Sequence, residues 1–332
     1  MNTDSFDIVT IGDTVIDAFI KISLGHIQET ANGVEYCLPF GTKIPYDSVT
    51  VIPAVGNSAN AAVSASRLGL KTAIVTFLGN DTNGKDCIEK FEKEKISTQF
   101  ITQEEGKKTN YHYVLWHGDD RTILIKHEEF TSKLPDIGKP KWIYLSSLGE
   151  HTLPLHGEIA DYLEKNKEVK LAFQPGSFQI KLGKDALSRI YSRADVFCAN
   201  KEEVEQILGI QSDDFKVLLD GMHALGPRIV LITDGPHGAY MKNENEYYEP
   251  LYPDIAPPLD RTGAGDAFSS TFVSYLILGK TPEEAIMCAP INSMSVEQYI
   301  GAQEGLLTQE QIEEYLKKAP ENYKLKTLDN RQ

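Results

Sequence analysis

The sequence is poor in the residues that mark secreted, metal-binding and membrane-spanning proteins. Its 332 residues include four cysteines, and their wide spacing fits neither a disulfide framework nor a zinc motif: Cys37, Cys87, Cys198 and Cys288. The chain has no apolar run near the roughly 20 residues that cross a bilayer. Residues 1–5 lack the basic start of a signal peptide. We therefore expect a reduced, cytoplasmic protein with no membrane partner.

Positive charge is also scarce. The chain has 33 Lys and Arg against 48 Asp and Glu, a net charge of −15. An acidic surface argues against nucleic acid and anionic membranes as partners. It does not exclude a nucleotide held by local backbone amides and a metal ion. The eight histidines form no metal-binding motif, and we expect them to be ordinary surface or packing residues.

Short apolar runs alternate with helical patterns along most of the chain. Strand-like runs lie at 7–12, 72–77, 142–145, 171–173, 196–198 and 229–232, and helical stretches near 154–166, 183–192 and 201–208. Such alternation requires crossover connections and a parallel sheet with helices on both faces. We predict one α/β domain over 1–332, a three-layer α/β/α fold with a doubly wound, mostly parallel sheet. The polar segment 319–332 is expected to be a peripheral tail.

Two segments interrupt this alternation. Residues 18–55 and 99–128 contain short β-prone pieces separated by glycine, proline and turn residues, without a helical period. We predict that these two β-rich excursions project from the main sheet and pack together as a small β lid.

The most informative stretch is the heptad from Asp260 to Asp266, which an apolar helical run follows directly. Backbone N–H groups of Gly263, Ala264 and Gly265 at a helix N-terminus form a seat for an anion. A carboxylate at the same place, Asp266, suits a general base that takes a proton from a hydroxyl attacking phosphorus. The pattern predicts a small-molecule kinase. The alternative is a helix start that needs small residues and an acidic cap.

Two stretches resemble signatures of the ribokinase/pfkB family of carbohydrate and nucleoside kinases. The heptad resembles Asp-Thr-x-Gly-Ala-Gly-Asp, with Arg261 as the departure. Residues 55–69 resemble Gly-Gly-x-x-x-Asn-x-Ala followed by Arg-x-Gly, with Val55 in place of the first glycine. The resemblance runs from Gly12 to Gly301. It implies a ribokinase-like fold whose lid closes over the sugar and often forms the dimer contact, so we expect a homodimer through the β lid.

The resemblance assigns the acceptor site to Asp17, Gly56, Asn57 and Asn60. Asp17 follows the first strand, and ligands of doubly wound sheets lie beyond the carboxyl ends of strands. Asn57 and Asn60 are three residues apart, so they share a face of the helix. The alternatives are a helix cap for Asn57 and a surface acid for Asp17. We interpret Asp13 as a turn or surface acid.

The resemblance places the nucleotide at two further strand ends. Asn200 and Glu203 match a motif that acts through water on Mg²⁺ and the ATP phosphates, although a capping pair is the alternative. Thr233, Gly235 and Gly238 match a turn beside the phosphates, with a plain hairpin turn as the alternative. Gly301-Ala302 resembles a Gly-Ala pair close to the adenine pocket, and Gln174 receives no role.

The predicted cofactors are therefore ATP and Mg²⁺. Some family members also bind a monovalent cation such as K⁺ near the anion seat, and Arg261 lies close to that position, so this cation is left open. The first choice of acceptor is a ribose- or hexose-like sugar. The second is a nucleoside, for which Phe19, Tyr111, Tyr113 or Trp116 could supply an aromatic slot. The third alternative is a non-catalytic sugar or nucleotide sensor.

Residues 79–85 fit the spacing Gly-x-x-x-x-Gly-Lys of a P-loop, but Asp86 stands where Ser or Thr would bind Mg²⁺. Asp81 and Asp86 would also repel phosphates. We expect a turn into a helix here, as the family resemblance implies.

Overall fold

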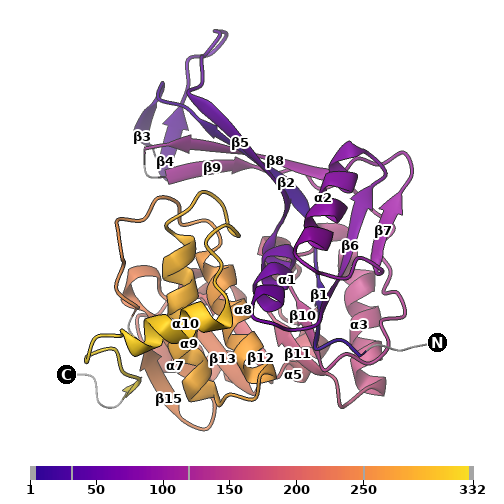
Figure 1. The fold of residues 1–332 in the computed structure, drawn as a ribbon, viewed down its shortest axis with the longest axis vertical. Coiled ribbons are helices and arrows are strands. Elements are labelled where there is room, and N and C mark those ends of the chain that lie inside the picture. The colour runs from indigo at the N-terminus through magenta and orange to yellow at the C-terminus, as the bar shows by residue number, and fades with distance from the viewer. Residues whose placement is uncertain (1–4, 31–32, 119, 250, 329–332) are drawn as a thin grey trace.

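The computed structural model describes residues 5–30, 33–118, 120–249 and 251–328. Its centre is a ten-stranded sheet in the order β16-β15-β14-β13-β12-β11-β10-β1-β6-β7 (Figure 1). Seven neighbouring strands run parallel: β7 (Ile101–Glu104), β6 (Thr72–Gly79), β1 (Ile8–Ile11), β10 (Trp142–Leu145), β11 (Lys170–Phe173), β12 (Val196–Asn200) and β13 (Ile229–Thr233). Three antiparallel strands extend the other edge: β14 (Ala239–Lys242), β15 (Glu246–Glu249) and β16 (Lys326–Thr327).

Helices cover both faces of this sheet. One face carries α1 (Asn57–Arg67), α2 (Thr82–Lys93), α8 (Ala264–Ile277), α9 (Pro282–Val296) and α10 (Gln309–Lys317). The other carries α3 (Leu153–Lys165), α5 (Ser188–Arg193), α6 (Lys201–Leu208) and α7 (Phe215–His223). The short helices η1 (Glu150–Thr152), α4 (Ser177–Leu182) and η2 (Gly235–His237) lie in connections.

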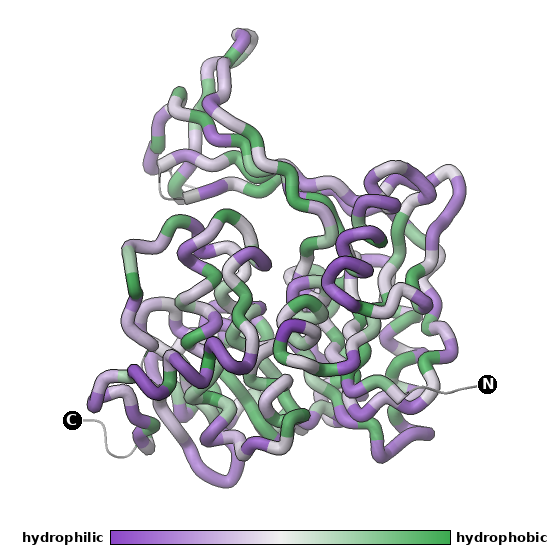
Figure 2. Tube along the Cα trace, viewed as in Figure 1, coloured by the Kyte–Doolittle hydropathy of each residue, from purple (hydrophilic) through white to green (hydrophobic). Residues whose placement is uncertain are grey.

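Strand side chains alternate between two hydrophobic cores. In β10, Trp142 and Tyr144 pack under α8 and α9, whereas Ile143 and Leu145 face α3. Because both faces are covered, the central strands are apolar throughout, as is typical of parallel sheets. Figure 2 shows hydrophobic residues along the central strands and hydrophilic ones along outer helices such as α10. The predicted three-layer α/β/α fold is confirmed.

A second sheet forms the lid above the body in Figure 1. Its order is β5-β2-β8-β9, built from β5 (Ser48–Val55), β2 (Val15–Lys21), β8 (Asn110–His117) and β9 (Asp120–Leu124). A hairpin of β3 (His26–Thr30) and β4 (Gly33–Cys37) is attached to it along the chain. Both predicted excursions therefore contribute strands to one sheet.

Several sequence-based boundaries differ from the structure. β7 lies inside the range 99–128 but pairs with β6 in the central sheet, so the second excursion contributes only β8 and β9 to the lid. The expected helix at 183–192 begins only at Ser188, as α5, and α4, α7 and β15 were not predicted. The tail is less peripheral than expected because Tyr323 is buried and β16 pairs with β15. Its last residues, 329–332, lie outside the described residues.

The remaining expectations concern turns and membrane spans. Residues 79–85 form a turn into α2, and Asp81 caps that helix by accepting a hydrogen bond from Gly84 N at 2.8 Å. The Asp81 carboxylate also accepts from Thr109 Oγ1, so it serves the local structure. In the described part of the chain, no helix is both long and apolar enough to span a bilayer.

We predict that Glu94 stabilises the contact between α1 and the end of α2. Burial opposes its ionisation, but hydrogen bonds from Arg67 and Lys90 outweigh burial and lower the pKa of Glu94 from 4.5 to about 2. Glu94→Gln should therefore lower the free energy of unfolding at pH 7 by roughly 1–3 kcal/mol. Because the folded-state pKa is depressed, the difference in free energy of unfolding between wild type and Glu94→Gln should shrink as the pH falls from 4.5 to about 2. Urea unfolding at several pH values measures this difference. A difference that stays constant with pH would contradict the stabilising role of the Glu94 charge.

Candidate active site

The site is built around the start of α8. Gly263 caps this helix with φ of 83°, a left-handed conformation that glycine adopts without strain. A Cβ atom at Gly263 would lie 2.2 Å from the Cβ of Ala302, so the close packing also requires glycine. The N–H groups of the first helical turn have no acceptor within the helix. They lie where the heptad predicted an anion seat, and Ala264 N reaches the backbone oxygen of Arg261 only at 3.5 Å.

Asp266 lies in the first turn of α8 and is 9% exposed. Its Oδ2 atom accepts a hydrogen bond from Asn60 Nδ2 at 2.7 Å, and its Oδ1 atom accepts one from Gln174 Nε2 at 3.0 Å. Asn60 comes from α1, and Gln174 follows β11. Two side-chain amides from distant parts of the chain thus hold the carboxylate in place.

The protonation of Asp266 reflects two opposing effects. Burial raises the pKa of Asp266 above its usual 3.8, because the charged form loses water. Hydrogen bonds from Asn60, Gln174 and Asn57 lower it again. A raised pKa makes a carboxylate a better proton acceptor, and the amide donors keep the ionised form accessible.

A cavity of about 230 Å³ lies on one side of Asp266. Its lining is mostly polar and includes Asn57, Gln174, Asn200, Glu203, Thr233, Gly263, Gly265 and Ser269. Asn200 and Glu203 also form the capping pair considered above: Asn200 Oδ1 accepts from Glu203 N at 2.8 Å, and Glu203 Oε2 accepts from Asn200 N at 3.0 Å. Capping thus fixes both side chains at the wall of this middle cavity.

The middle cavity suits Mg²⁺ bound together with phosphates. Burial raises the pKa of Glu203, and the nearby Asp266 charge raises it further, so a cation would relieve both effects. The described residues contain no cluster of three or more acidic, histidine or cysteine side chains able to hold a metal alone. Mg²⁺ typically combines one or two carboxylates with substrate phosphates and several waters. Glu203 with Asn200 meets that requirement.

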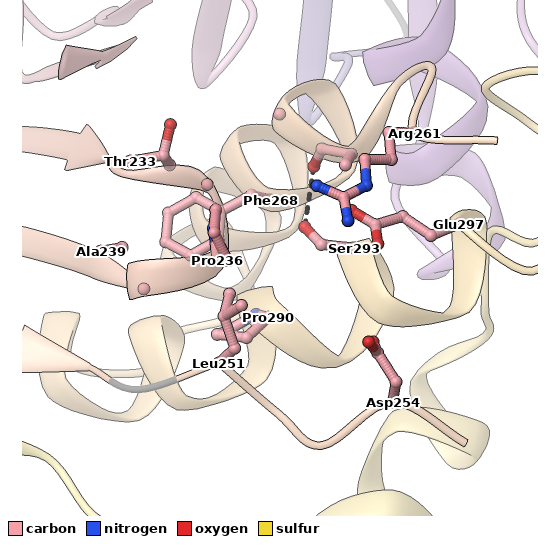
Figure 3. Close-up of a pocket in the computed structure, with 14 residues that line it drawn as sticks. Thr233, Pro236, Ala239, Leu251, Asp254, Arg261, Phe268, Pro290, Ser293 and Glu297 are labelled. Carbon is pink, nitrogen blue, oxygen red and sulfur yellow. Dashed lines mark hydrogen bonds between the residues drawn. The ribbon is translucent and has the colours of Figure 1, made fainter. Parts of the chain in front are cut away.

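A second cavity, of about 270 Å³, adjoins the middle one through Thr233 and Gly265. Figure 3 shows its apolar part, where Phe268, Pro236, Leu251 and Pro290 lie close together. Arg261, Glu297 and Asp254 form its charged part. Gly235 and Gly238 complete the lining beside η2. Because an apolar slot next to a polar cavity is the form that a nucleotide site takes, we call this second cavity the nucleotide cavity.

Arg261, the departure from the family heptad, lines the nucleotide cavity. Burial raises the pKa of Glu297, while the positive charge of Arg261 lowers it. The neighbouring Asp260 binds backbone groups: its carboxylate accepts hydrogen bonds from Gly301 N at 2.9 Å and Thr262 N at 2.9 Å. Asp266 makes no ion pair with Arg261 among the described contacts and instead faces two cavities.

A third cavity, of about 310 Å³, lies between the body and the lid and shares Asp266 and Asn57 with the middle one. We call it the acceptor cavity, because it contains all four residues that the sequence assigned to the acceptor: Asp17, Gly56, Asn57 and Asn60. Gly56 has φ of 113°, and a Cβ atom there would lie 2.7 Å from the backbone oxygen of Asp13. Val55, which replaces a family glycine, is buried at the end of β5.

The structure corrects three expectations around this cavity. Asp13 lines it and is not a surface acid, and His112 and His127 line it rather than serving as ordinary surface or packing residues. Ala302 lines it too, so Gly301-Ala302 lies on the acceptor side and not beside the adenine slot. Gln174 had no assigned role yet contacts Asp266. Its place directly after a buried strand was the one signal that could have found it.

Fold and site together fit a small-molecule kinase: an apolar cavity beside η2, a polar cavity with a buried carboxylate at the start of α8, and a cavity under the lid follow one another. The description "pfkB family carbohydrate kinase" matches residues 8–309. The chain belongs to this family, and it is a phosphotransferase with an alcohol group as acceptor.

Similar proteins agree with this assignment. Mouse ribokinase is 26% identical over 287 residues, which cover 81% of each chain. The structure of Arabidopsis thaliana ribokinase complexed with ribose and ATP has a TM-score of 0.78 at 19% identity, covering 94% of this chain and 99% of that one. A nucleoside kinase structure from Methanocaldococcus jannaschii has a TM-score of 0.75 at 17% identity, with 95% and 99% covered. Both structures show the ribokinase-like fold.

We predict that Gln174 tunes Asp266. Gln174→Met keeps the side-chain volume but removes the amide donor, so the pKa of Asp266 should rise further and the acid limb of the kcat/KM profile should move to higher pH. The expected shift is roughly one pH unit, since one unit corresponds to about 1.4 kcal/mol and a hydrogen bond to a charged group contributes about 1.5–3 kcal/mol.

The matched control is Tyr144→Phe. The Tyr144 hydroxyl donates to the oxygen of the same Gln174 amide, whereas the hydrogen bonds to Asp266 come from Asn60 and Gln174. Tyr144→Phe should therefore leave the acid limb of the kcat/KM profile largely in place. An unshifted acid limb in Gln174→Met would show that the Gln174 amide does not control the pKa of Asp266.

Proposed function

We propose that the protein transfers the γ-phosphoryl group of ATP to a hydroxyl of a ribose- or hexose-like sugar, with Asp266 as the general base. The observation that carries this proposal is the position of Asp266 on the wall shared by the middle and acceptor cavities. A carboxylate there reaches an acceptor hydroxyl on one side and a phosphate on the other. A sensor that only binds sugar or nucleotide needs no such base.

The proposed reaction proceeds by positioning and electrostatics. Asp17 and Asn60 orient the acceptor so that its hydroxyl points to Asp266, which takes the proton as the oxygen attacks phosphorus. N–H groups of Gly263, Ala264 and Gly265 stabilise the charge on the group in transfer, without reorganising. The lid excludes water that would otherwise hydrolyse ATP.

The nucleotide side follows the same order of cavities. Thr233, Gly235 and Gly238 hold the phosphates near η2, and the apolar slot of Figure 3 takes the base. Asn200 and Glu203 would hold Mg²⁺ through water, and the ion would neutralise developing phosphate charge. No contact among the described residues marks a site for K⁺, and our proposal does not depend on one.

A sugar suits the acceptor cavity better than a nucleoside. The aromatic slot that a nucleoside would need was expected from Phe19, Tyr111, Tyr113 or Trp116. In the described part of the protein, none of these four lines the acceptor cavity, and Tyr111 and Tyr113 line a different one. Phe178 is the one Phe, Tyr or Trp ring in the described lining of the acceptor cavity, a lining rich in hydroxyl-binding groups.

We also propose a homodimer formed through the lid. The lid exposes large apolar side chains, among them Val34, Val49, Val51 and Leu124. Exposed apolar patches mark interaction surfaces.

The four cysteines are free thiols, which suits the reducing cytoplasm that we propose as the location of the protein.

The decisive prediction concerns Asp266→Asn. This variant should keep the fold and bind the sugar but lose at least about a hundredfold in kcat, the low end for a general base. Glu310→Gln, which changes an exposed acid in the first turn of α10, is the control and should keep full activity.

Activity is measured as ATP turnover against a panel of ribose, fructose, glucose and nucleosides. Turnover with a sugar supports the proposal, and preference for a nucleoside would move the assignment to the second candidate. Near-normal turnover by Asp266→Asn would remove Asp266 from the role of base.

A further inference from the structure

The acceptor cavity contains two aspartate–histidine pairs. The proposed reaction uses Asp17 but gives no role to either histidine or to the pairing. His112 Nδ1 lies 3.5 Å from Asp17 Oδ1, and His127 Nδ1 lies 3.1 Å from Asp13 Oδ2. All four side chains are only 12–16% exposed and line the same cavity, so they face its interior rather than bulk solvent.

The backbone brings each pair together. Asp17 in β2 and His112 in β8 are register partners in a parallel strand pair, so their side chains share one face of the lid sheet. Asp13 follows β1 in the body, whereas His127 follows β9 in the lid, so the second pair joins body and lid. The two imidazole rings are 5.5 Å apart, and the ring of Phe178 meets His127 edge-on.

Both pairs have buried polar atoms without a hydrogen-bond partner. Within the described residues these atoms are Asp13 Oδ2, Asp17 Oδ1, His112 Nε2 and His127 Nδ1. Each pair is within ion-pair distance, but the directions of donor and acceptor do not complete a hydrogen bond. Buried polar atoms in folded proteins are nearly always hydrogen-bonded. Hydroxyl groups of a ligand, which both donate and accept, are the chemistry that would satisfy them.

The charge of the cavity restricts that ligand further. Asp13, Asp17 and Asp266 place three carboxylates around it, and no lysine or arginine belongs to its described lining. Arg121, on the lid strand that also contributes Ile123, directs its guanidinium to Asp260 at 3.9 Å. Phosphate and carboxylate groups on a ligand are normally bound by arginine or lysine. An anionic acceptor would instead meet like charge here.

We infer that Asp17–His112 and Asp13–His127 determine acceptor specificity: they bind an uncharged polyol through hydroxyls other than the one phosphorylated, and they exclude acceptors that carry phosphate or carboxylate groups. This inference rests on the proposed kinase function. It assigns the two histidines as substrate-binding residues that complete the cavity from the lid side.

The test measures steady-state kinetics with ribose, fructose, glucose and adenosine, and with two phosphates of each that carry the group on different hydroxyls: ribose 1- and 5-phosphate, fructose 1- and 6-phosphate, glucose 1- and 6-phosphate, and 3′- and 5′-AMP. One phosphate of each pair then leaves the accepting hydroxyl free. The wild type should prefer an uncharged acceptor over its phosphate by at least about tenfold in kcat/KM, equivalent to one hydrogen bond to a charged group. His112→Gln and His127→Gln should raise the KM for that acceptor by about tenfold. Their kcat and their KM for ATP should change much less, since neither residue lies near the nucleotide cavity.

His117→Gln is the matched control. His117 lies on the same strand β8, but it binds the backbone oxygen of Ile22 and stacks on Tyr36 outside the cavity. It should keep wild-type constants. Asp13→Asn provides a second, nearly isosteric variant should a histidine variant not fold, and it too should raise the acceptor KM.

The outcomes separate the two proposals. The specificity role alone would be overturned if the wild type turns over an acceptor and three folded variants keep the wild-type KM for that acceptor. These variants are His112→Gln, His127→Gln and Asp13→Asn. Preference for a phosphorylated acceptor would overturn the specificity role as well. Absence of turnover with every acceptor would overturn the kinase proposal, and the specificity role with it.

Discussion

The arrangement of the site depends on one buried carboxylate and the amides that hold it. Asp266 is separated by 206 residues from Asn60 and by 92 from Gln174, yet both donate hydrogen bonds to it. Burial alone favours the protonated acid, which cannot accept a proton. The fold therefore has to bring the starts of α1 and α8 and the end of β11 to one point. The close packing of Gly263 on Ala302 fixes the helix start in that position.

Three cavities follow one another in a fixed order, and Asp266 lines the second and third of them. Thr233 and Gly265 belong to both the nucleotide and the middle cavity, and Asn57 and Asp266 to both the middle and the acceptor cavity. A phosphoryl group moving from nucleotide to acceptor would pass the N-terminus of α8 on this path. The capping pair of Asn200 and Glu203 lies beside it, so the same two residues cap the start of helix α6 and line the middle cavity.

The fold was predictable because its signals are local. Central strands such as Trp142–Leu145 are buried on both faces and are therefore continuously apolar, which distinguishes them from the helices between them. The heptad at 260–266 and the pair at 200 and 203 were equally visible, because their members are neighbours in sequence. Gln174 and His127 were not, since a single polar residue after a strand has no pattern of its own. Their partners, Asp266 and Asp13, lie far away in the chain. β7 was misplaced for a similar reason: only its pairing with β6 shows which sheet it joins.

The most direct test of the central claim is a structure of the protein with ADP, Mg²⁺, aluminium fluoride and the sugar that it phosphorylates best. The account predicts that the fluoride complex lies against the N–H groups of Gly263 to Gly265. It also predicts that the attacking hydroxyl lies about 2.6–3.2 Å from the Asp266 carboxylate. A sugar bound outside the acceptor cavity, or a hydroxyl in contact with a different base, would contradict it.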